Sequence, residues 1–413
     1  MNIGLLTYHC PPNFGAQLQS VSTVGFLRNL GHNVVVLNWY PQDLEAMYAQ
    51  RIPNEQVVCH QQFADQNLPL SPLLRNEQEV IEQIEHSNLD AIVVGSDALF
   101  KYKPEKLRRH FSKRRLRYIV SPPSLSVMGL SGNVFFGAFI AKLNKTLPVG
   151  VYAVSSQNTP YQEMTRHEED DMRTAMSHFS FISVRDKWTQ MMVQHITHRS
   201  FVPIYPDPVF AFNSNSYLTV PSKAEILSKY NLSANYVLLS FSDWYCKSAY
   251  IADISRNLSA RGLQPVALPM PEKLFNPGIA HHIELPLSPI DWYALIIHSR
   301  GYIGERMHPI VVCLHNAVPF YSFDEYGVKR TKGLFPFNKK VYDPLSSKTH
   351  TIVAEAGLLD NLYSYQSTSP FPLPSAVVDG ICHFDADRCR AFSQAKYKEY
   401  KQGMAHLLAT LSQ

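Results

Sequence analysis

The chain has 413 residues, of which 45% are hydrophobic and 17% are charged. This balance is typical of a folded protein with two or three domains, and it excludes a disordered polyelectrolyte. The formal net charge of +4 is too small to indicate nucleic acid as a partner.

Signals for membrane insertion and for disulfides are both missing from the sequence. No apolar stretch approaches the ~20 residues that a membrane helix needs, and the first residues lack the basic and long apolar segments of a signal peptide. The six cysteines are scattered without a CxxC pair, which indicates reduced thiols. We therefore expect a cytoplasmic protein.

One segment, residues 103–117, concentrates basic side chains. A run of this kind most often forms a solvated surface. The alternative is peripheral contact with anionic lipid head groups at the inner membrane face, or with a phosphorylated acceptor. The sequence leaves both interpretations open.

The first half of the chain alternates short apolar runs with segments of helical spacing. In chain order we expect strands over residues 2–8, 33–40, 90–97, 147–158 and 181–186, with helices over 16–32, 78–87 and 161–178. Continuous apolar runs are typical of strands buried on both faces. The pattern predicts a parallel sheet with helices on both faces, and residues 205–212 close this half.

The alternation restarts after a polar link near residues 213–222. We expect strands over 236–244, 264–271, 301–308 and 317–323, with helices over 247–261, from Ser288 onward, and between the last two strands. A long amphipathic helix follows over residues 386–411. The predicted domains are therefore 1–218 and 219–385, with a C-terminal segment 386–413 that packs back on the body.

Polar residues follow several of the predicted strands. In open α/β sheets, ligands bind outside the carboxyl ends of the strands, so we expect these residues to converge on one cleft between the domains. For the serines and the aspartate, helix capping and turn chemistry explain the residue types equally well. The set comprises Asn13, Ser96, Asp97, Ser155, Ser156, Arg185, Glu305, Arg306 and His308.

The segment "GERMHP", residues 304–309, is the most informative of these. Pro309 favours the first turn of a helix, which places His308 at or beside the N-cap. Helix N–H groups and the Arg306 guanidinium would then form a receptor for phosphate or carboxylate. The helix dipole and Arg306 would lower the pKa of His308, whereas Glu305 and a bound dianion would raise it. His308 is thus a proton donor in the liganded state.

Arg185 follows another predicted strand and offers a second anion contact. Its alternative role is a salt bridge to Asp186, Asp207 or Glu305. The sequence contains no glycine-rich phosphate motif and no HExxH-type metal signature. These absences disfavour a P-loop kinase and an ordinary dinucleotide dehydrogenase, and they give no indication of a metal.

Several stretches together resemble the polysaccharide pyruvyl transferase family. They are the opening strand with its "NFGAQLQ" loop, "DAIVVGSD", "SVRD", "DPVF" and, most specifically, "GERMHPIVVCLHNAVPF". Their order and spacing cover roughly residues 1–340. The resemblance implies two Rossmann-like domains in a GT-B-type arrangement with a cleft between them. The first domain would lie on the acceptor side and the second on the donor side.

The resemblance also implies a reaction and a set of site residues. The donor would be phosphoenolpyruvate, used as a co-substrate without a cofactor, and the acceptor a sugar or lipid-linked oligosaccharide of a surface polysaccharide, exopolysaccharide or capsule. Two hydroxyls would receive the pyruvate as a ketal. Arg306 and the Met307 backbone would hold the donor, and His308 would act as acid and base. Arg185 would be the other anion-binding arginine.

A donor-binding lysine is expected a little beyond the histidine. Lys329 is the nearest, with Arg330 and Lys332 as competitors. Departures from the family pattern, such as Pro309 in place of a small residue, leave two alternatives open. One is a GT-B glycosyltransferase that uses a nucleotide sugar, and the other is a non-catalytic protein that binds sugars or anions.

Overall fold

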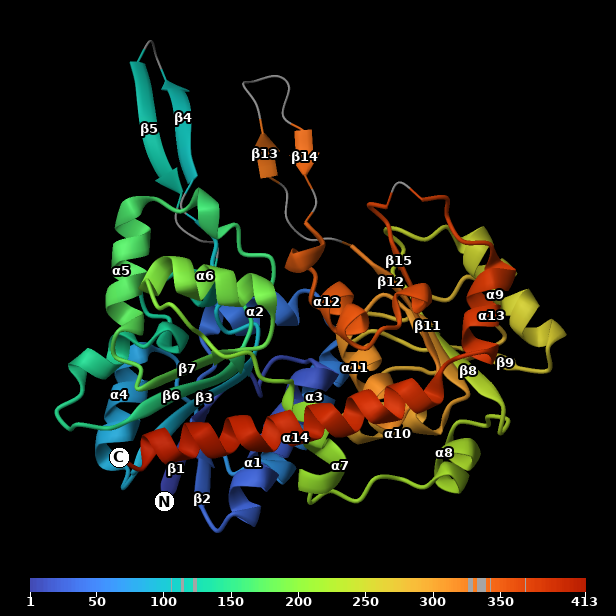
Figure 1. Cartoon of the computed structure of the whole chain (residues 1–413), viewed down its shortest axis with the longest axis horizontal. Helices are drawn as coiled ribbons and strands as arrows, with labels where there is room; N and C mark the ends of the chain where they lie inside the picture. Colours follow the sequence, from blue (N-terminus) through green and yellow to red (C-terminus); the bar gives the residue numbers. More distant parts are fainter. Residues whose placement is uncertain are drawn as a thin grey trace.

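The computed structural model describes residues 1–104, 106–112, 115–121, 125–325, 330–332, 339–341, 343–367 and 369–413. Lys329, the donor-binding lysine expected from the resemblance, lies outside these residues. The basic run 103–117 falls mostly on two paired strands, β4 (Lys106–Ser112) and β5 (Arg115–Ser121). This hairpin and a second one, β13 (Arg330–Lys332) with β14 (Lys339–Val341), extend from the same side of the molecule in Figure 1.

The N-terminal half is built on a parallel sheet with the strand order β2-β1-β3-β6-β7. Its strands are β1 (Asn2–Leu6), β2 (Asn33–Val36), β3 (Ala91–Asp97), β6 (Val149–Val154) and β7 (Phe181–Val184). Leu5 pairs with Val36 on one side and with Val93 on the other, so the apolar runs share one register. Every residue of β3 and β6 is buried, as expected for central parallel strands.

Helices cover both faces of this sheet (Figure 1). They are α1 (Phe14–Asn29), α2 (Gln42–Ala49), α3 (Asn54–Asn67), α4 (Glu77–His86), α5 (Arg166–Met176), α6 (Lys187–Thr197) and α7 (Phe212–Asn215). Short 3-10 turns lie at η1 (Ser126–Met128), η2 (Val134–Phe136), η3 (Ala138–Lys142), η4 (Tyr161–Glu163) and η5 (Pro208–Ala211). The Asn13 side chain caps α1 by accepting the Ala16 N–H at 3.2 Å.

The C-terminal half repeats this plan with the parallel order β10-β9-β8-β11-β12-β15. Its strands are β8 (Tyr236–Ser240), β9 (Gln264–Ala267), β10 (His281–His282), β11 (Gly301–Gly304), β12 (Phe320–Asp324) and β15 (Leu362–Ser364). Its helices are α8 (Lys223–Lys229), α9 (Ser248–Ala260), α10 (Pro289–His298), α11 (Met307–Asn316), α12 (Lys348–Glu355) and α13 (Pro374–Cys382), with 3-10 turns η6 (Pro344–Ser346) and η7 (Leu359–Asn361).

The two halves are joined by a continuous core. One cluster of buried apolar side chains runs from Ile3 of the first sheet to Leu238 of the second. Phe14 at the start of α1 stacks on Trp292 of α10, with ring centroids 5.1 Å apart. The Gln56 side chain bonds both the N–H and the carbonyl of Leu287, at 2.7 and 2.9 Å. Apolar burial and polar pairing thus fix the two sheets relative to each other.

The last helix, α14 (Ala386–Leu411), runs across both halves (Figure 1). It packs against β6 in the first half and against α11 in the second. In the part of the chain that the structure describes, no helix is long and apolar enough to cross a bilayer.

The predicted α/β class is confirmed: the chain has two parallel sheets and a long C-terminal helix. Several elements were not expected from the sequence. Helices α2 and α3 fill residues 42–67, where polar and apolar positions show little helical periodicity. Strand β2 ends at Val36 rather than at residue 40, because the chain leaves the sheet at Leu37.

Gly25 marks the closest contact between α1 and α7. A Cβ atom at this position would lie 1.8 Å from the Asn215 carbonyl oxygen. Alanine normally stabilises a helix by about 1 kcal/mol relative to glycine. The Asn215 backbone cannot move aside as a flexible side chain could. We therefore expect Gly25→Ala to lower the free energy of unfolding by about 1–3 kcal/mol. Chemical denaturation measures this.

Asn29→Ala is the matched control, because Asn29 lies on the exposed end of the same helix. It should leave stability unchanged or raise it by a few tenths of a kcal/mol. A Gly25→Ala protein as stable as the parent would contradict the close packing of α1 on α7.

Candidate active site

His308 lies in the first turn of α11, which begins directly after β11. Arg306 is the N-cap residue and Met307 the first helical residue, so Pro309 lies in the first turn as predicted, but His308 is the second helical residue and not the N-cap or its neighbour. The imidazole of His308 lies against Gly15 of α1. A Cβ atom at residue 15 would lie 2.0 Å from the His308 Cγ, so only glycine fits there. The "NFG" loop of the first domain and the histidine of the second therefore form one site.

Arg185 lies at the end of β7 and is paired inside the protein. Its Nη1 donates to the Asp207 carboxylate, and its Nη2 lies 3.8 Å from Asp97. The Arg185 side chain is 3% exposed, and that of Asp207 is fully buried. The Gln19 amide donates to the same Asp207 oxygen at 2.5 Å. The salt bridge to Asp207 is thus one of the pairings that the sequence left open for Arg185.

A lysine that the sequence reasoning missed joins these residues. Lys348 is the first residue of α12, directly after its N-cap Ser347. Burial lowers the pKa of Lys348 to about 8, and the charge of Arg185 adds to the effect. Lys348 lies 19 residues beyond Lys329 along the chain. The signal for it was a serine cap followed by a short helical segment, which the sequence does not connect to the site.

We call His308, Arg185, Asp97, Asp207 and Lys348 the charged cluster. Burial lowers the pKa of His308, whereas the negative charges of Asp97 and Asp207 raise it. The positive charges of Arg185 and Lys348 lower it. The carboxylates that raise this pKa thus come from the first domain. The sequence had assigned that role to Glu305.

Several buried nitrogen atoms of the charged cluster make no hydrogen bond to the described residues. Within the described residues, Arg185 Nε, Arg185 Nη2 and His308 Nε2 are buried and make no hydrogen bond. Buried donors without a partner cost about 1–3 kcal/mol each. Beside Lys348, they suit a ligand that accepts hydrogen bonds and carries negative charge.

Asp97 is held in an uncommon backbone conformation, with φ at +102°. Its carboxylate accepts the Ala98 N–H at 2.7 Å, and its carbonyl accepts the Ser155 N–H at 2.7 Å. The charges of His308, Lys348 and Arg185, together with the Ala98 bond, hold the pKa of this carboxyl below its usual value, although burial acts the other way. Strained residues of this kind persist where the surroundings hold them, often at functional sites.

The serines predicted at this sheet edge face the protein interior. Ser96 Oγ donates to the Ala153 carbonyl at 3.2 Å, and Ser155 Oγ accepts the Gln157 N–H at 3.0 Å. Both are buried. The Ser96 bond joins the end of β3, which carries Asp97, to β6.

Glu305 and Arg306 do not join the charged cluster. Glu305 accepts from Ser242 N–H and Oγ, at 2.9 and 2.6 Å, and from the Tyr365 hydroxyl at 2.7 Å. The Arg306 side chain is 54% exposed and bonds Glu272 at 3.0 Å and the Met270 sulfur at 3.2 Å. Both residues are therefore engaged within the second domain.

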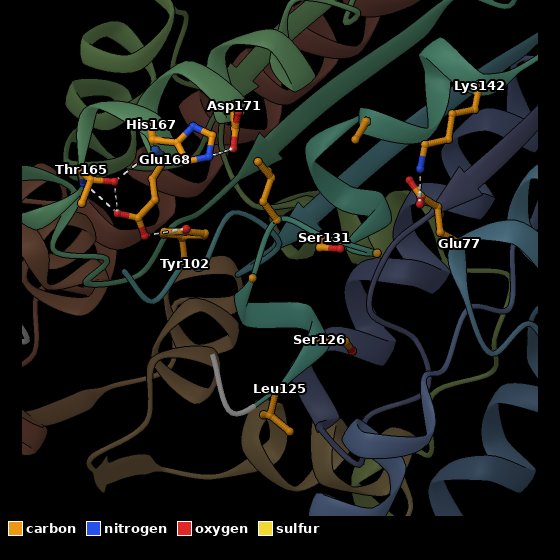
Figure 2. Close-up of a pocket in the computed structure, with 14 residues that line it drawn as sticks. Glu77, Tyr102, Leu125, Ser126, Ser131, Lys142, Thr165, His167, Glu168 and Asp171 are labelled. Atoms are coloured by element: carbon orange, nitrogen blue, oxygen red, sulfur yellow. Dashed lines mark hydrogen bonds and ion pairs between the residues drawn. The ribbon is translucent and has the colours of Figure 1, made fainter. Parts of the chain in front are cut away.

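A separate cavity of about 620 Å³ lies in the first domain, lined by α4, α5 and the 3-10 turns (Figure 2). The Tyr102 hydroxyl donates to Glu168 at 2.8 Å on one side, and Lys142 pairs with Glu77 at 2.6 Å on another. No member of the charged cluster lines it. Across the described ranges, no three His, Cys, Asp or Glu side chains gather as metal ligands would.

Comparison with solved structures identifies the fold. The chain is similar to Arabidopsis thaliana UGT89C1, with a TM-score of 0.52 and 9% identity over 99% of both chains. It also matches the spinosyn forosaminyltransferase SpnP, with a TM-score of 0.48 and 12% identity over the full length of both. The first likeness shows the GT-B glycosyltransferase-like fold. No curated protein matches the sequence.

The family is narrower than the fold. The model of the family described as polysaccharide pyruvyl transferase matches residues 13–325, which is most of the chain and includes every member of the charged cluster except Lys348. The chain therefore belongs to the polysaccharide pyruvyl transferase family. This confirms the resemblance seen in the sequence motifs.

The electrostatics of the charged cluster predict that two variants shift the pKa of His308 in opposite directions. Asp97→Asn removes a negative charge and should lower the pKa of His308. Asparagine also tolerates a positive φ. Lys348→Met removes a positive charge and should raise the pKa of His308. An NMR titration of the His308 ring protons, assigned by difference from a His308→Gln sample, measures both.

Glu272→Gln is the control, since Glu272 pairs with Arg306 outside the charged cluster. It should leave the titration of His308 unchanged. Shifts of the same sign in Asp97→Asn and Lys348→Met would contradict the arrangement.

Proposed function

We propose that this chain transfers the pyruvate unit of phosphoenolpyruvate onto two hydroxyls of a sugar, forming a cyclic ketal in glycan biosynthesis. Family membership supports a pyruvyl transferase. The observation that carries the proposal is the buried set of unpartnered nitrogens on Arg185 and His308 beside Lys348. Phosphoenolpyruvate brings both a phosphate and a carboxylate, which such a site would bind.

The donor would lie between the two helix N-termini and Arg185. Free N–H groups at the start of α11, including that of Met307, attract an anion. Lys348 at the start of α12 adds a positive charge, and Arg185 offers the two nitrogens that its salt bridge leaves unused. Arg306 would join by turning from Glu272 toward the donor. With these groups matching the donor's charge, the proposed reaction needs no divalent ion.

The proposed reaction begins with a proton from His308 to the methylene carbon of the donor. A sugar hydroxyl then adds to the adjacent carbon and releases its proton, which restores the acid. Loss of phosphate and addition of a second hydroxyl, whose proton passes to the departing phosphate, close the ketal. One phosphoenolpyruvate and one diol thus yield one ketal and one phosphate. Burial lowers the pKa of His308, so the negative charge of the bound donor is what would keep its ring protonated.

The acceptor in this proposal is a free sugar or a lipid-linked oligosaccharide. The protein would act in the cytoplasm. With a lipid-linked acceptor, the basic residues 103–117 would contact anionic lipid at the inner membrane face.

The first functional test is turnover. Purified protein is incubated with phosphoenolpyruvate and a panel of β-galactosides, N-acetylhexosamines and lipid-linked sugars, and phosphate release is coupled to detection of the ketal. We expect His308→Gln to lower turnover by about 10²-fold or more, while donor binding falls far less. Near-normal turnover would remove His308 from the mechanism. Release of a nucleoside diphosphate from a nucleotide sugar would support the glycosyltransferase alternative, and binding without turnover a non-catalytic protein.

The role of Lys348 predicts a second kinetic effect. Losing a charged contact to a dianion should weaken both ground-state and transition-state binding. We expect Lys348→Met to lower kcat/KM for phosphoenolpyruvate by about 10²- to 10³-fold. Lys142→Met is the control, because Lys142 pairs with Glu77 far from the charged cluster. Equal kinetics for the two variants would make Lys348 a structural residue.

A further inference from the structure

Trp244 is an exposed tryptophan in a protein that buries its others. Its side chain is 80% exposed, whereas Trp39, Trp188 and Trp292 are 2%, 0% and 3% exposed. Trp244 lies on the loop of residues 241–247, which follows β8 at the carboxyl edge of the second sheet. A large aromatic surface left in water at a ligand-binding edge marks an interaction site.

A stack of aromatic rings begins at Tyr245, the residue after Trp244. Tyr245 stacks on Tyr365, with centroids 5.0 Å apart and planes inclined by 20°. Tyr365 in turn lies parallel to Phe371, at 6.2 Å and 23°. Tyr245 and Phe371 remain 43% and 41% exposed. We call Trp244, Tyr245, Tyr365 and Phe371 the aromatic platform.

The aromatic platform is tied to the helix that carries His308. Glu305 accepts from Ser242 of the Trp244 loop through one carboxylate oxygen and from the Tyr365 hydroxyl through the other. Glu305 directly precedes Arg306, the N-cap of α11. The Glu305 carboxylate therefore connects the loop of residues 241–247, the residue after β15 and the start of α11.

Among the described residues around the aromatic platform, acidic and basic side chains are balanced, with Lys247 and Glu325 of opposite charge. Asp243 pairs with Lys273 at 2.6 Å, and Glu272 pairs with Arg306 at 3.0 Å. The Tyr245 hydroxyl donates to Glu325. This rim offers hydrogen-bonding groups without a surplus of positive charge, so it suits neutral hydroxyls better than nucleotide phosphates or anionic lipid.

We propose that the aromatic platform binds a pyranose ring of the acceptor glycan, at a position removed from the sugar that receives pyruvate. The C–H face of a pyranose is weakly positive and packs on the negative face of an aromatic ring, while its hydroxyls bond the polar rim. This subsite rests on the proposed function, since it names the acceptor as an oligosaccharide. Contact with a remote ring supplies binding energy that a monosaccharide lacks.

Trp244 provides its own reporter for the test. Because the other tryptophans are buried, acrylamide quenching of tryptophan fluorescence reports chiefly on Trp244. The probes are tetrasaccharides ending in β-galactose, N-acetylhexosamine or mannose, the matching methyl monosaccharides, UDP, and phosphatidylglycerol vesicles. Donor is left out, so the readout is independent of any reaction.

We expect at least one tetrasaccharide to lower the quenching constant about two-fold or more, while its monosaccharide has little effect. Protection by UDP or by vesicles without protection by any tetrasaccharide would overturn the subsite. Failure of every probe would overturn it as well.

Kinetics separate the subsite from the reaction. Trp244→Ala should raise KM for the protecting tetrasaccharide about 3- to 10-fold, with kcat and the KM for phosphoenolpyruvate unchanged. Phe201→Ala removes another exposed aromatic ring, 71% exposed in the first domain, and should change none of these. If a tetrasaccharide protects Trp244 from quenching but no phosphate is released, the subsite is supported and the proposed reaction is contradicted. If phosphate is released but no tetrasaccharide protects Trp244, the proposed reaction is supported and the subsite is contradicted.

Discussion

The salt bridge between Arg185 and Asp207 is the interaction on which the site depends. Both side chains are almost completely buried, and removing one partner of such a pair typically costs about 3–5 kcal/mol because the other charge stays uncompensated. Asp97 at the end of β3 adds a second carboxylate beside the guanidinium. The sheet edge is thus held by charge balance. Arg185 Nη1 makes the bond to Asp207, whereas Nε and Nη2 make no hydrogen bond among the described residues.

The charged cluster exists only because the two halves of the chain meet closely. The missing side chain of Gly15 makes room for the His308 ring, and the stacking of Phe14 on Trp292 lies one residue away along α1. Helix α14 packs on both halves. Close packing of this kind holds groups from both halves at fixed distances, which the proposed proton transfer requires. Any relative movement of the halves would change the surroundings of His308 first.

Glu305 shows how a residue's neighbours decide its role. Next to His308 in sequence, it was a candidate for tuning that histidine, yet its oxygens are taken up by Ser242 and Tyr365. Asp97 and Asp207 carry the negative charge that acts on His308 instead. Glu305 links the start of α11 to the aromatic rings of the second domain. Glu305 therefore connects the start of the helix that carries His308 to the exposed aromatic surface.

The sequence by itself determined the α/β class, the long last helix, the family and the positions of His308 and Arg185, because apolar periodicity and short motifs are local properties. Only the tertiary structure decided that Lys348 joins them and that Arg306 bonds Glu272 instead. Lys348 lies 40 residues after His308 along the chain. Which distant groups share a buried space depends on long-range packing and charge balance, and no local pattern encodes either.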